Sequence, residues 1–253
     1  MRIMGLPISP ERLVGKNGSK IADFGRVIQE ANCDIAIFPE TALTGFYPER
    51  EELYTDRSEK GGPFMLFSEL AAASGSSIVA GVAESRGEQF FNSAAVFDRQ
   101  GYLLGSYDKR HPFTLEREDR VITPGVQDPV FEIGNFSISI RICFDLRFPK
   151  DFHHESEKPD IVIVIANWPE VRSDHWETLL RARAIEGEVS VIGLNRSGVD
   201  RLGQKFDGSG LAFNPLGARY DNLNLTPEGL FLWDIQPRED FLTVGRTRGA
   251  LNV

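Results

Sequence analysis

The chain has 253 residues, a length that suits one large domain with a deep hydrophobic core. Hydrophobic residues make up 41% of it and charged residues 26%, as in ordinary globular proteins, and the formal net charge is −9. Nucleic-acid binding requires clusters of lysine and arginine that neutralise phosphates, and this acidic balance argues against it. We therefore expect no nucleic-acid partner.

The N-terminal seven residues lack an apolar segment followed by a cleavage site, so we predict no signal peptide. The longest uninterrupted apolar run, Ile161–Ala166, is far shorter than the ~20 residues that span a bilayer, and we expect no membrane partner. Two cysteines, Cys33 and Cys143, could form at most one disulfide. We expect a cytoplasmic protein in a reducing environment, in which Cys33 is a buried structural thiol.

The first forty residues predict a strand, a helix and a second strand. Residues 1–8 indicate a short strand, and Lys20–Ala31 places apolar residues at helical spacing. The apolar run Asp34–Phe38 is typical of a buried strand, and it ends at Pro39 and Glu40. This order is the start of an α/β fold.

Further elements follow as far as a long charged segment. A helix is predicted over Phe64–Ala73, and strands over Ser77–Ala83, Asn92–Phe97 and Tyr102–Leu104. Lys109–Gly125 then forms a long loop rich in charge and proline. Loops of this length in a compact domain are often functional.

The second half of the chain alternates strands with one helix. Ser137–Ile142 has the period of a strand with one face on the core, and it stops at Cys143. The helix Asp174–Gly187 has Asp174 and Glu177 at the spacing of a capping box. Further strands are predicted at Ile161–Ala166, Val189–Leu194 and Gly210–Phe213.

No repeat, low-complexity tract or linker interrupts this order, so we predict one domain over residues 1–253. The strands outnumber the helices between them, which favours a mixed sheet and a layered architecture. The C-terminal tail alternates only weakly, and its segment with glycine and arginine fits no predicted element.

Glu40, Lys109 and Cys143 each stand where an apolar strand gives way to a loop. A thiol needs a base to become a nucleophile, and a buried carboxylate is a suitable base. A fixed ammonium stabilises the negative charge that develops on a carbonyl under attack. The three groups together suffice for acyl transfer through a thioester. Taken singly, each also has a structural interpretation: a small buried hydrophobe, a loop carboxylate and a solvated lysine.

The segments around these residues resemble the nitrilase (carbon–nitrogen hydrolase) superfamily. Phe38–Phe46, Tyr107–His111 and Ile142–Pro149 are similar in order and spacing to its three motifs. The resemblance continues through Ala166–Pro169, Trp176–Glu186 and Asn195–Gly198. It therefore covers most of the chain.

The resemblance implies a role for each motif residue. Cys143 would be the nucleophile and Glu40 the general base. Lys109 would stabilise the tetrahedral intermediate together with the backbone N–H of Phe144.

A second glutamate of the family precedes the third motif. Here it falls on Glu118, which would hold Lys109 and orient the attacking water, with Glu116 as the alternative. The family fold is a four-layer α/β/β/α sandwich, and its members commonly pair. The resemblance thus implies this fold and a homodimer or a larger homo-oligomer.

The residues after the nucleophile are similar to the ω-amidase branch of the superfamily. Arg147 occupies the position that is thought to receive a substrate carboxylate in that branch, and guanidinium suits this task. The alternative for Arg147 is a structural salt bridge with Asp145 or another carboxylate, and we interpret Asp145 as structural. Asn167 and Trp168, from the fourth matching segment, are expected to contact substrate with Phe144.

Three departures from the branch pattern concern substrate choice rather than the catalytic residues. Pro112 stands where leucine or isoleucine is usual, and Phe144 replaces the more common tyrosine. Gly208 and Ser209 stand where the branch more often has a histidine or an aspartate between a glycine and a serine.

Metal and cofactor chemistry is not indicated. The four histidines, His111, His153, His154 and His175, show no metal-binding spacing. We therefore predict no metal and no cofactor.

The sequence thus predicts an amidase that hydrolyses a small, linear, carboxylate-bearing amide such as 2-oxoglutaramate or 2-oxosuccinamate and releases ammonia. Alternatives within the family are an N-carbamoyl amine amidohydrolase and an aliphatic amidase. A protein that keeps the fold but only binds or scaffolds is the alternative from another class.

Overall fold

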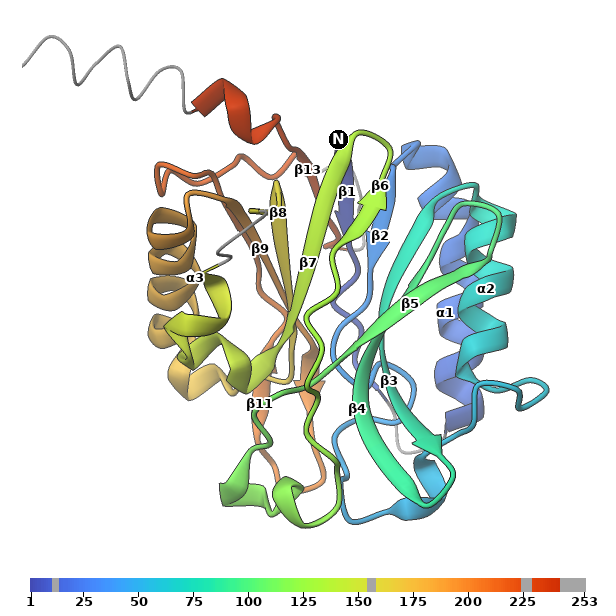
Figure 1. Ribbon diagram of the computed structural model, residues 1–253. Helices are drawn as coiled ribbons and strands as arrows, with labels where there is room; N and C mark the ends of the chain where they lie inside the picture. The colour runs from blue at the N-terminus through green and yellow to red at the C-terminus, as the bar shows by residue number, and fades with distance from the viewer. Residues whose placement is uncertain (11–13, 154–157, 224–228, 242–253) are drawn as a thin grey trace, which may run out of the picture.

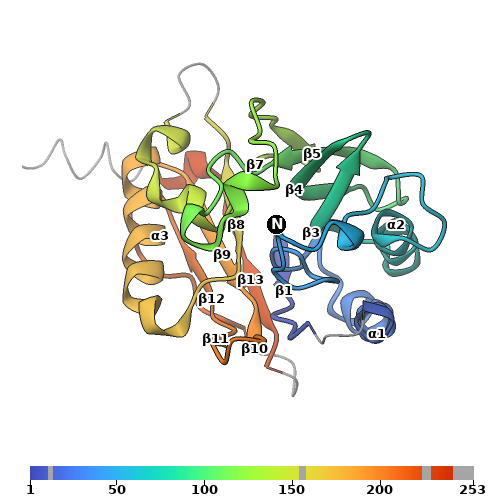
Figure 2. The same ribbon diagram turned by 90° about the horizontal axis from the view of Figure 1, so that it is seen from below.

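The computed structural model describes residues 1–10, 14–153, 158–223 and 229–241. Two β-sheets lie face to face in its centre (Figure 1). The helices α1 (Val14–Ala31) and α2 (Pro63–Ser74) cover the outer face of one sheet, and α3 (Ser173–Gly187) covers the outer face of the other (Figure 2). The α/β/β/α sandwich implied by the resemblance is therefore confirmed.

The first sheet has six strands in the order β13-β1-β2-β3-β4-β5. Its strands are β1 (Arg2–Gly5), β2 (Ile35–Ile37), β3 (Ser77–Arg86), β4 (Gln89–Phe97), β5 (Leu103–Asp108) and β13 (Phe231–Asp234). β1, β2 and β3 run parallel, whereas β13, β4 and β5 pair antiparallel with their neighbours. The sheet is mixed, as the surplus of strands predicted.

The second sheet has the order β12-β9-β8-β7-β6. Its strands are β6 (Phe131–Ile133), β7 (Phe136–Ile142), β8 (Ile161–Ala166), β9 (Ser190–Asn195) and β12 (Gly210–Phe213). β7, β8 and β9 are parallel, and a separate hairpin joins β10 (Ser197–Val199) to β11 (Lys205–Asp207). Short 3₁₀ helices lie in the connections: η1 (Glu51–Leu53), η2 (Thr114–Glu116), η3 (Glu118–Arg120), η4 (Cys143–Arg147), η5 (Pro149–Phe152) and η6 (Glu170–Arg172).

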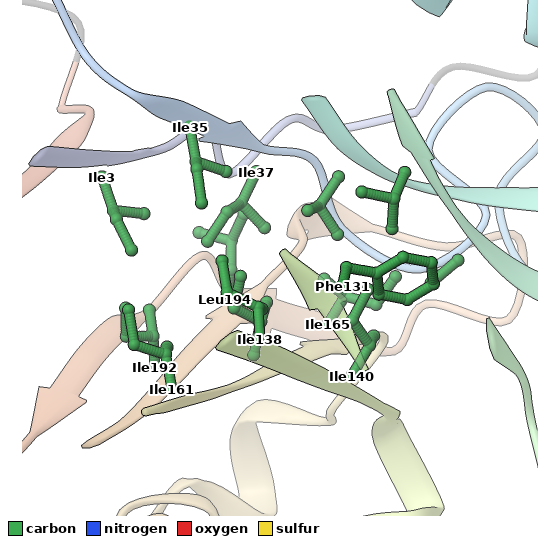
Figure 3. Packing of buried hydrophobic residues seen from close by; sticks show 14 of the residues in the cluster. Ile3, Ile35, Ile37, Phe131, Ile138, Ile140, Ile161, Ile165, Ile192 and Leu194 are labelled. Carbon is green, nitrogen blue, oxygen red and sulfur yellow. The ribbon is translucent and has the colours of Figure 1, made fainter. Parts of the chain in front are cut away.

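The main core lies between the two sheets and consists largely of isoleucine. Figure 3 shows Ile3, Ile35 and Ile37 of the first sheet facing Ile138, Ile140 and other residues of the second. β8 is buried on both faces: Ile163 points to this core, whereas Val164 packs toward α3. A strand buried on both faces must be apolar throughout, which explains the unbroken run at Ile161–Ala166.

One predicted helix start and one predicted helix cap were wrong. α1 begins at Val14, six residues before the predicted start, although glycines weaken this first turn. Asn17 offsets that weakness because its buried side-chain amide donates to the carbonyl of Leu43 at 2.6 Å. α3 begins at Ser173 with no side-chain cap, so Asp174 lies inside the first turn and the predicted capping box does not form.

The C-terminal tail contains a strand that the sequence did not indicate. β13 pairs antiparallel with β1, with Trp233 opposite Ile3. The partner strand lies at the other end of the chain, and local pattern cannot reveal such a pairing. The predicted segment with glycine and arginine lies outside the described residues.

Two glycines allow the chain to approach itself beside the strand ends. A Cβ on Gly81 of β3 would lie 2.5 Å from the Cα of Glu40, and one on Gly125 would lie 2.8 Å from the carbonyl carbon of Asp108. Both distances are too short for non-bonded atoms, so only glycine fits there without a shift of the backbone. Gly81 thus permits the position of Glu40, and Gly125 permits that of Lys109. The backbone N–H of Gly125 donates to the carbonyl of Lys109 at 2.9 Å.

No helix among the described residues is long and apolar enough to cross a membrane.

The central core predicts a large effect of truncation in β8. Ile163→Ala should lower the free energy of unfolding by about 2–5 kcal/mol because it leaves a cavity between the sheets. Val126→Ala, at a side chain that is 86% exposed, should change it by less than about 0.5 kcal/mol. Urea denaturation of both variants measures the difference. Equal, small effects would contradict the described core.

Candidate active site

The three residues that follow strand ends converge on one pocket. Glu40 lies three residues beyond β2, Lys109 directly follows β5, and Cys143 directly follows β7. All three line one open pocket between the loops at the carboxyl ends of these strands. Residues from both sheets therefore build the site, although Glu40 and Cys143 are more than one hundred positions apart in the chain.

Lys109 is the centre of a buried ion network. Its side chain is 1% exposed, and its Nζ lies 2.9 Å from Glu40 Oε1 and 2.9 Å from Glu118 Oε2. Burial alone would lower the pKa of this lysine, but the charges of Glu118 and Glu40 outweigh burial and raise the pKa well above its ordinary value. The lysine is therefore an ammonium at neutral pH.

Glu40 is fully buried and receives four donors. Its Oε1 accepts from Lys109 Nζ and from Asn92 Nδ2 at 2.7 Å. Its Oε2 accepts from the backbone N–H of Asn167 at 2.7 Å and from the side-chain amide of Asn167 at 3.1 Å. Burial would raise the pKa of Glu40, but the charge of Lys109 and these hydrogen bonds prevail and lower it. Glu40 is held as a carboxylate.

Cys143 is the first residue of η4 and lies partly exposed in a strained turn directly after β7. Its backbone φ is +47°, a left-handed conformation that costs a non-glycine residue about 1–3 kcal/mol. Its Sγ lies 3.7 Å from the carbonyl oxygen of Asn167. Burial, together with the negative charge of Glu40, raises the pKa of the thiol well above its ordinary value. At neutral pH the site thus contains a neutral thiol beside an ionised carboxylate.

Asp145 fixes this turn from behind. Its carboxylate accepts from the N–H of Ile142 at 3.0 Å, from the N–H of His111 at 2.9 Å and from the hydroxyl of Tyr107 at 2.9 Å. Burial raises the pKa of Asp145 to about 6. Asp145 does not line the pocket, which agrees with the structural interpretation of this residue.

The structure distinguishes the two candidate auxiliary glutamates. Glu118 is buried in η3 and contacts Lys109, and its Oε2 also accepts from the N–H of Phe113 at 2.6 Å. Glu116 is exposed and lines the pocket without an ion pair to Lys109. The predicted contact of Glu118 with Lys109 is thus present. Glu118 does not line the pocket, so its predicted second role, the orientation of an attacking water, stays a prediction.

Arg147 lines the pocket without a carboxylate partner among the described residues. Its guanidinium lies 4.8 Å from the ring centre of Trp168, and its Nη2 lies 3.3 Å from Nδ1 of His175. The alternative salt bridge with Asp145 does not form. Burial and the charge of Arg172 lower the pKa of Arg147, as expected for a cation that faces another cation.

The remaining predicted residues also lie at the pocket. Phe144, Asn167 and Trp168 line it, and Phe144 packs edge-on against Phe148. Trp168 is held by its N–H, which donates to Asn195 Oδ1 at 2.7 Å. Asn167 has a structural task besides lining the pocket, since it positions Glu40.

Sequence reasoning missed several residues of the site. Asn92 contacts both Glu40 and Glu118, and its signal was a polar residue inside a largely apolar, buried strand, β4. Arg172 lies just before α3 and lines the pocket. Further lining residues are ones to which no individual role was given: Phe46, Phe113, Pro169, Arg196, Asp200, Gln204 and Phe206.

One group of possible metal ligands occurs in the described part of the chain. Atoms of His111, Asp145 and Asp151 lie within 4.8 Å of one another. These atoms already have partners, since Asp145 accepts three hydrogen bonds and His111 Nε2 lies 2.6 Å from Asp151. Arg110 also lies 3.2 Å from Asp151, and this cation disfavours a second one.

The ion network predicts a pH-dependent loss of stability when the ammonium is removed. Lys109→Met leaves two buried carboxylates uncompensated and should destabilise the fold by about 3–5 kcal/mol at about pH 7. The pKa of Glu40 is lowered in the folded wild type, so its ionised carboxylate stabilises the fold. This stabilisation is fully present above the pKa of the unfolded chain and is lost as the pH falls through the folded pKa. In Lys109→Met a carboxylate can take up a proton instead, so the destabilisation should shrink at about pH 5.

Urea denaturation at both pH values measures this effect. The double variant Lys109→Met/Glu118→Gln is the control, because it removes one of the two uncompensated charges and should recover part of the stability. A destabilisation that is equal at both pH values would contradict the described network.

Comparisons with known proteins place this chain in a family. The model of the carbon–nitrogen hydrolase family matches residues 4–239. A Staphylococcus aureus protein, hydrolase in agr operon, is 32% identical over 213 residues, or 83% of this chain and 81% of that protein. A 2-oxoglutaramate amidase of Bacillus subtilis (strain 168) is 30% identical over 200 residues, or 78% of this chain and 76% of that protein.

Among solved structures, a Xanthomonas campestris CN-hydrolase superfamily protein with an arsenic adduct in its active site has a TM-score of 0.86 to this chain. It is 28% identical, and the match covers 98% of this chain and 94% of that one. The family model and the relatives agree over most of the chain. The protein therefore belongs to the carbon–nitrogen hydrolase family.

Proposed function

We propose that this protein is an amidase that hydrolyses a small, linear, carboxylate-bearing amide through a thioester on Cys143. The observation that carries the substrate class is a pair of arginines. Arg147 and Arg172 line the same pocket as Cys143, and neither makes an ion pair within the described residues. Two unpaired guanidinium groups in a pocket favour an anionic ligand, and a carboxylate matches their planar geometry.

The first step is attack by the thiol. Cys143 Sγ bonds to the amide carbon while its proton passes to the carboxylate of Glu40, which suits a neutral thiol beside an ionised base. The carbonyl oxygen becomes an oxyanion. Lys109 Nζ donates to Glu40 Oε1 and to both carboxylate oxygens of Glu118. The positive charge of this ammonium, with the N–H of Phe144, would stabilise the oxyanion.

The second step releases ammonia. The tetrahedral intermediate collapses, the carbon–nitrogen bond breaks, and Glu40 returns its proton to the leaving nitrogen. A thioester remains on Cys143, and Glu40 is again a carboxylate. Water then gives a proton to Glu40 as its oxygen bonds to the thioester carbon. The carbon–sulfur bond breaks, and the sulfur recovers the proton from Glu40, which regenerates the thiol.

The relatives support an amide with a carboxylate at its far end. The Bacillus subtilis relative is a 2-oxoglutaramate amidase, whose substrate joins such a carboxylate to a terminal amide through a short chain. We propose 2-oxoglutaramate and 2-oxosuccinamate as the first substrates to test. Arg147 and Cys143 line the same pocket, as a short substrate requires.

We further propose a cytoplasmic homodimer or larger homo-oligomer. Both cysteines, Cys33 and Cys143, are free thiols, which fits a reducing compartment. The assembly is the one that the resemblance implies.

The nucleophile is tested by ammonia release from a panel of 2-oxoglutaramate, 2-oxosuccinamate, glutamine, a neutral aliphatic amide, an N-carbamoyl amine and a nitrile. The wild type should release ammonia from the oxo-acid amides. In Cys143→Ala the rate of ammonia release should fall by at least about 1000-fold. Cys33→Ala is the matched control, because Cys33 lies in the core beside α1 and should leave activity unchanged. Ammonia released with carbon dioxide from the carbamoyl compound would instead indicate a carbamoylase.

The arginine pair is tested by selectivity. Arg147→Ala and Arg172→Ala should each lower kcat/KM for 2-oxoglutaramate by about 10- to 100-fold, the value of a charge-assisted hydrogen bond. Activity on a neutral amide of equal length should remain within about threefold, since it has no carboxylate to lose. Equal losses on both substrates would remove the carboxylate assignment and leave the nucleophile untouched.

A further inference from the structure

Asn92 is in contact with every charged member of the buried network. It lies on β4 and is 2% exposed. Its Nδ2 donates to Glu40 Oε1 at 2.7 Å and to Glu118 Oε1 at 2.8 Å. Its backbone carbonyl accepts from the N–H of Lys109 at 2.9 Å. One neutral residue therefore touches both carboxylates through its side chain and the lysine through its backbone.

These contacts form a closed ring. Lys109 Nζ bridges Glu40 and Glu118 on one side, and Asn92 Nδ2 bridges the same two side chains on the other. Donors and acceptors alternate around the ring. An amide nitrogen has two N–H groups, and each is used on a different carboxylate.

The orientation of the amide is determined by its neighbours. Ionised carboxylates only accept hydrogen bonds, so the nitrogen of Asn92 must face Glu40 and Glu118. The Oδ1 atom of Asn92 is then buried without a hydrogen-bond partner among the described residues. An unpaired buried carbonyl is unfavourable, and its presence indicates that the two donated bonds matter more at this position.

The charge balance of the site explains why these donors are needed. Two buried carboxylates share one ammonium, which leaves a net negative charge. Without further donors, one carboxylate would tend to take up a proton and would cease to be a base. A neutral amide donates hydrogen bonds to both carboxylates. A second cation at this position would lower the basicity of Glu40 much further, because it would add a full positive charge.

We propose that Asn92 is a positioning residue that holds the side chains of Glu40 and Glu118 around Lys109 and thereby sets the lower pH limit at which Glu40 can act as a base. Asn167 differs from Asn92 because it contacts Glu40 and not Glu118. The proposal deepens the proposed function, since it concerns the base of that reaction.

Other groups also influence Glu40 and must be unchanged in the test. The titratable and charged side chains that interact with it come from several elements: Tyr54, Lys109, Glu116, Cys143 and Arg196. Glu118 is linked to it through Lys109 and Asn92. Substitutions at Asn92 leave all of these in place. The hydrogen bond from Asn92 lowers the pKa of Glu40, so its removal must move that pKa upward.

The experiment measures the pH dependence of two reactions of the full-length protein. One is the rate of Cys143 alkylation by iodoacetamide, followed at the peptide level by mass spectrometry. The other is kcat/KM for ammonia release from 2-oxoglutaramate. In Asn92→Ala the acid limb of both profiles should move to higher pH by about one unit or more. In Asn92→Asp it should move further, because a third carboxylate then lies beside the other two.

Ser93→Ala is the matched control. Ser93 is the next residue of β4, is equally buried, and donates to Asp108 outside the pocket at 2.7 Å. It should lower the melting temperature without moving either acid limb. Asn92→Asp has nearly the same shape as asparagine and provides a second variant if the alanine variant does not fold.

The proposal fails if Asn92→Ala and Asn92→Asp have a lower melting temperature or a lower reaction rate while the acid limb of each pH profile stays where it is in the wild type. A purely structural role would give that result. If the wild type releases no ammonia, the proposed function fails, but the alkylation profile of Cys143 still decides the role of Asn92.

Discussion

A lysine buried between two glutamates is the interaction on which the rest of this structure depends. Lys109 has almost no contact with solvent, and its charge is stable only because Glu40 and Glu118 lie 2.9 Å away. The same pairing keeps Glu40 ionised in a fully buried place. The thiol of Cys143 meets the opposite condition, since burial and the negative charge of Glu40 keep it protonated. Glu40 and Cys143, the proposed base and nucleophile, are thus set in opposite protonation states by one network.

The scaffold exists to hold these groups at one point. Glu40 comes from the first sheet and Cys143 from the second, and the isoleucine core between the sheets fixes their separation (Figure 3). Gly81 lets the segment of Glu40 approach β3, and Asp145 holds the strained turn of Cys143. Stability gained in the core therefore supports a local conformation that is unfavourable by itself.

The sequence predicted what depends on local pattern or on motif. Ile138 and Ile140 alternate along β7, and the residues at the strand ends indicated chemistry before the fold was known. The sequence alone did not distinguish Glu118 from Glu116. Both residues lie in an irregular loop, and the direction of each side chain depends on the backbone of the 3₁₀ helices η2 and η3. Asn92 was missed because one polar residue in a strand belongs to no periodic pattern that would indicate its role. Its partners, Glu40 and Glu118, also come from other segments of the chain.

The central claim is that Cys143 carries the acyl group while ammonia leaves. Mass spectrometry of the protein mixed briefly with 2-oxoglutaramate and quenched with acid tests it most directly. We predict an adduct equal to the substrate minus ammonia, located on the peptide that contains Cys143 and removed by hydroxylamine, as a thioester is. Ammonia release without any such adduct in wild type, together with full activity of Cys143→Ala, would contradict the account.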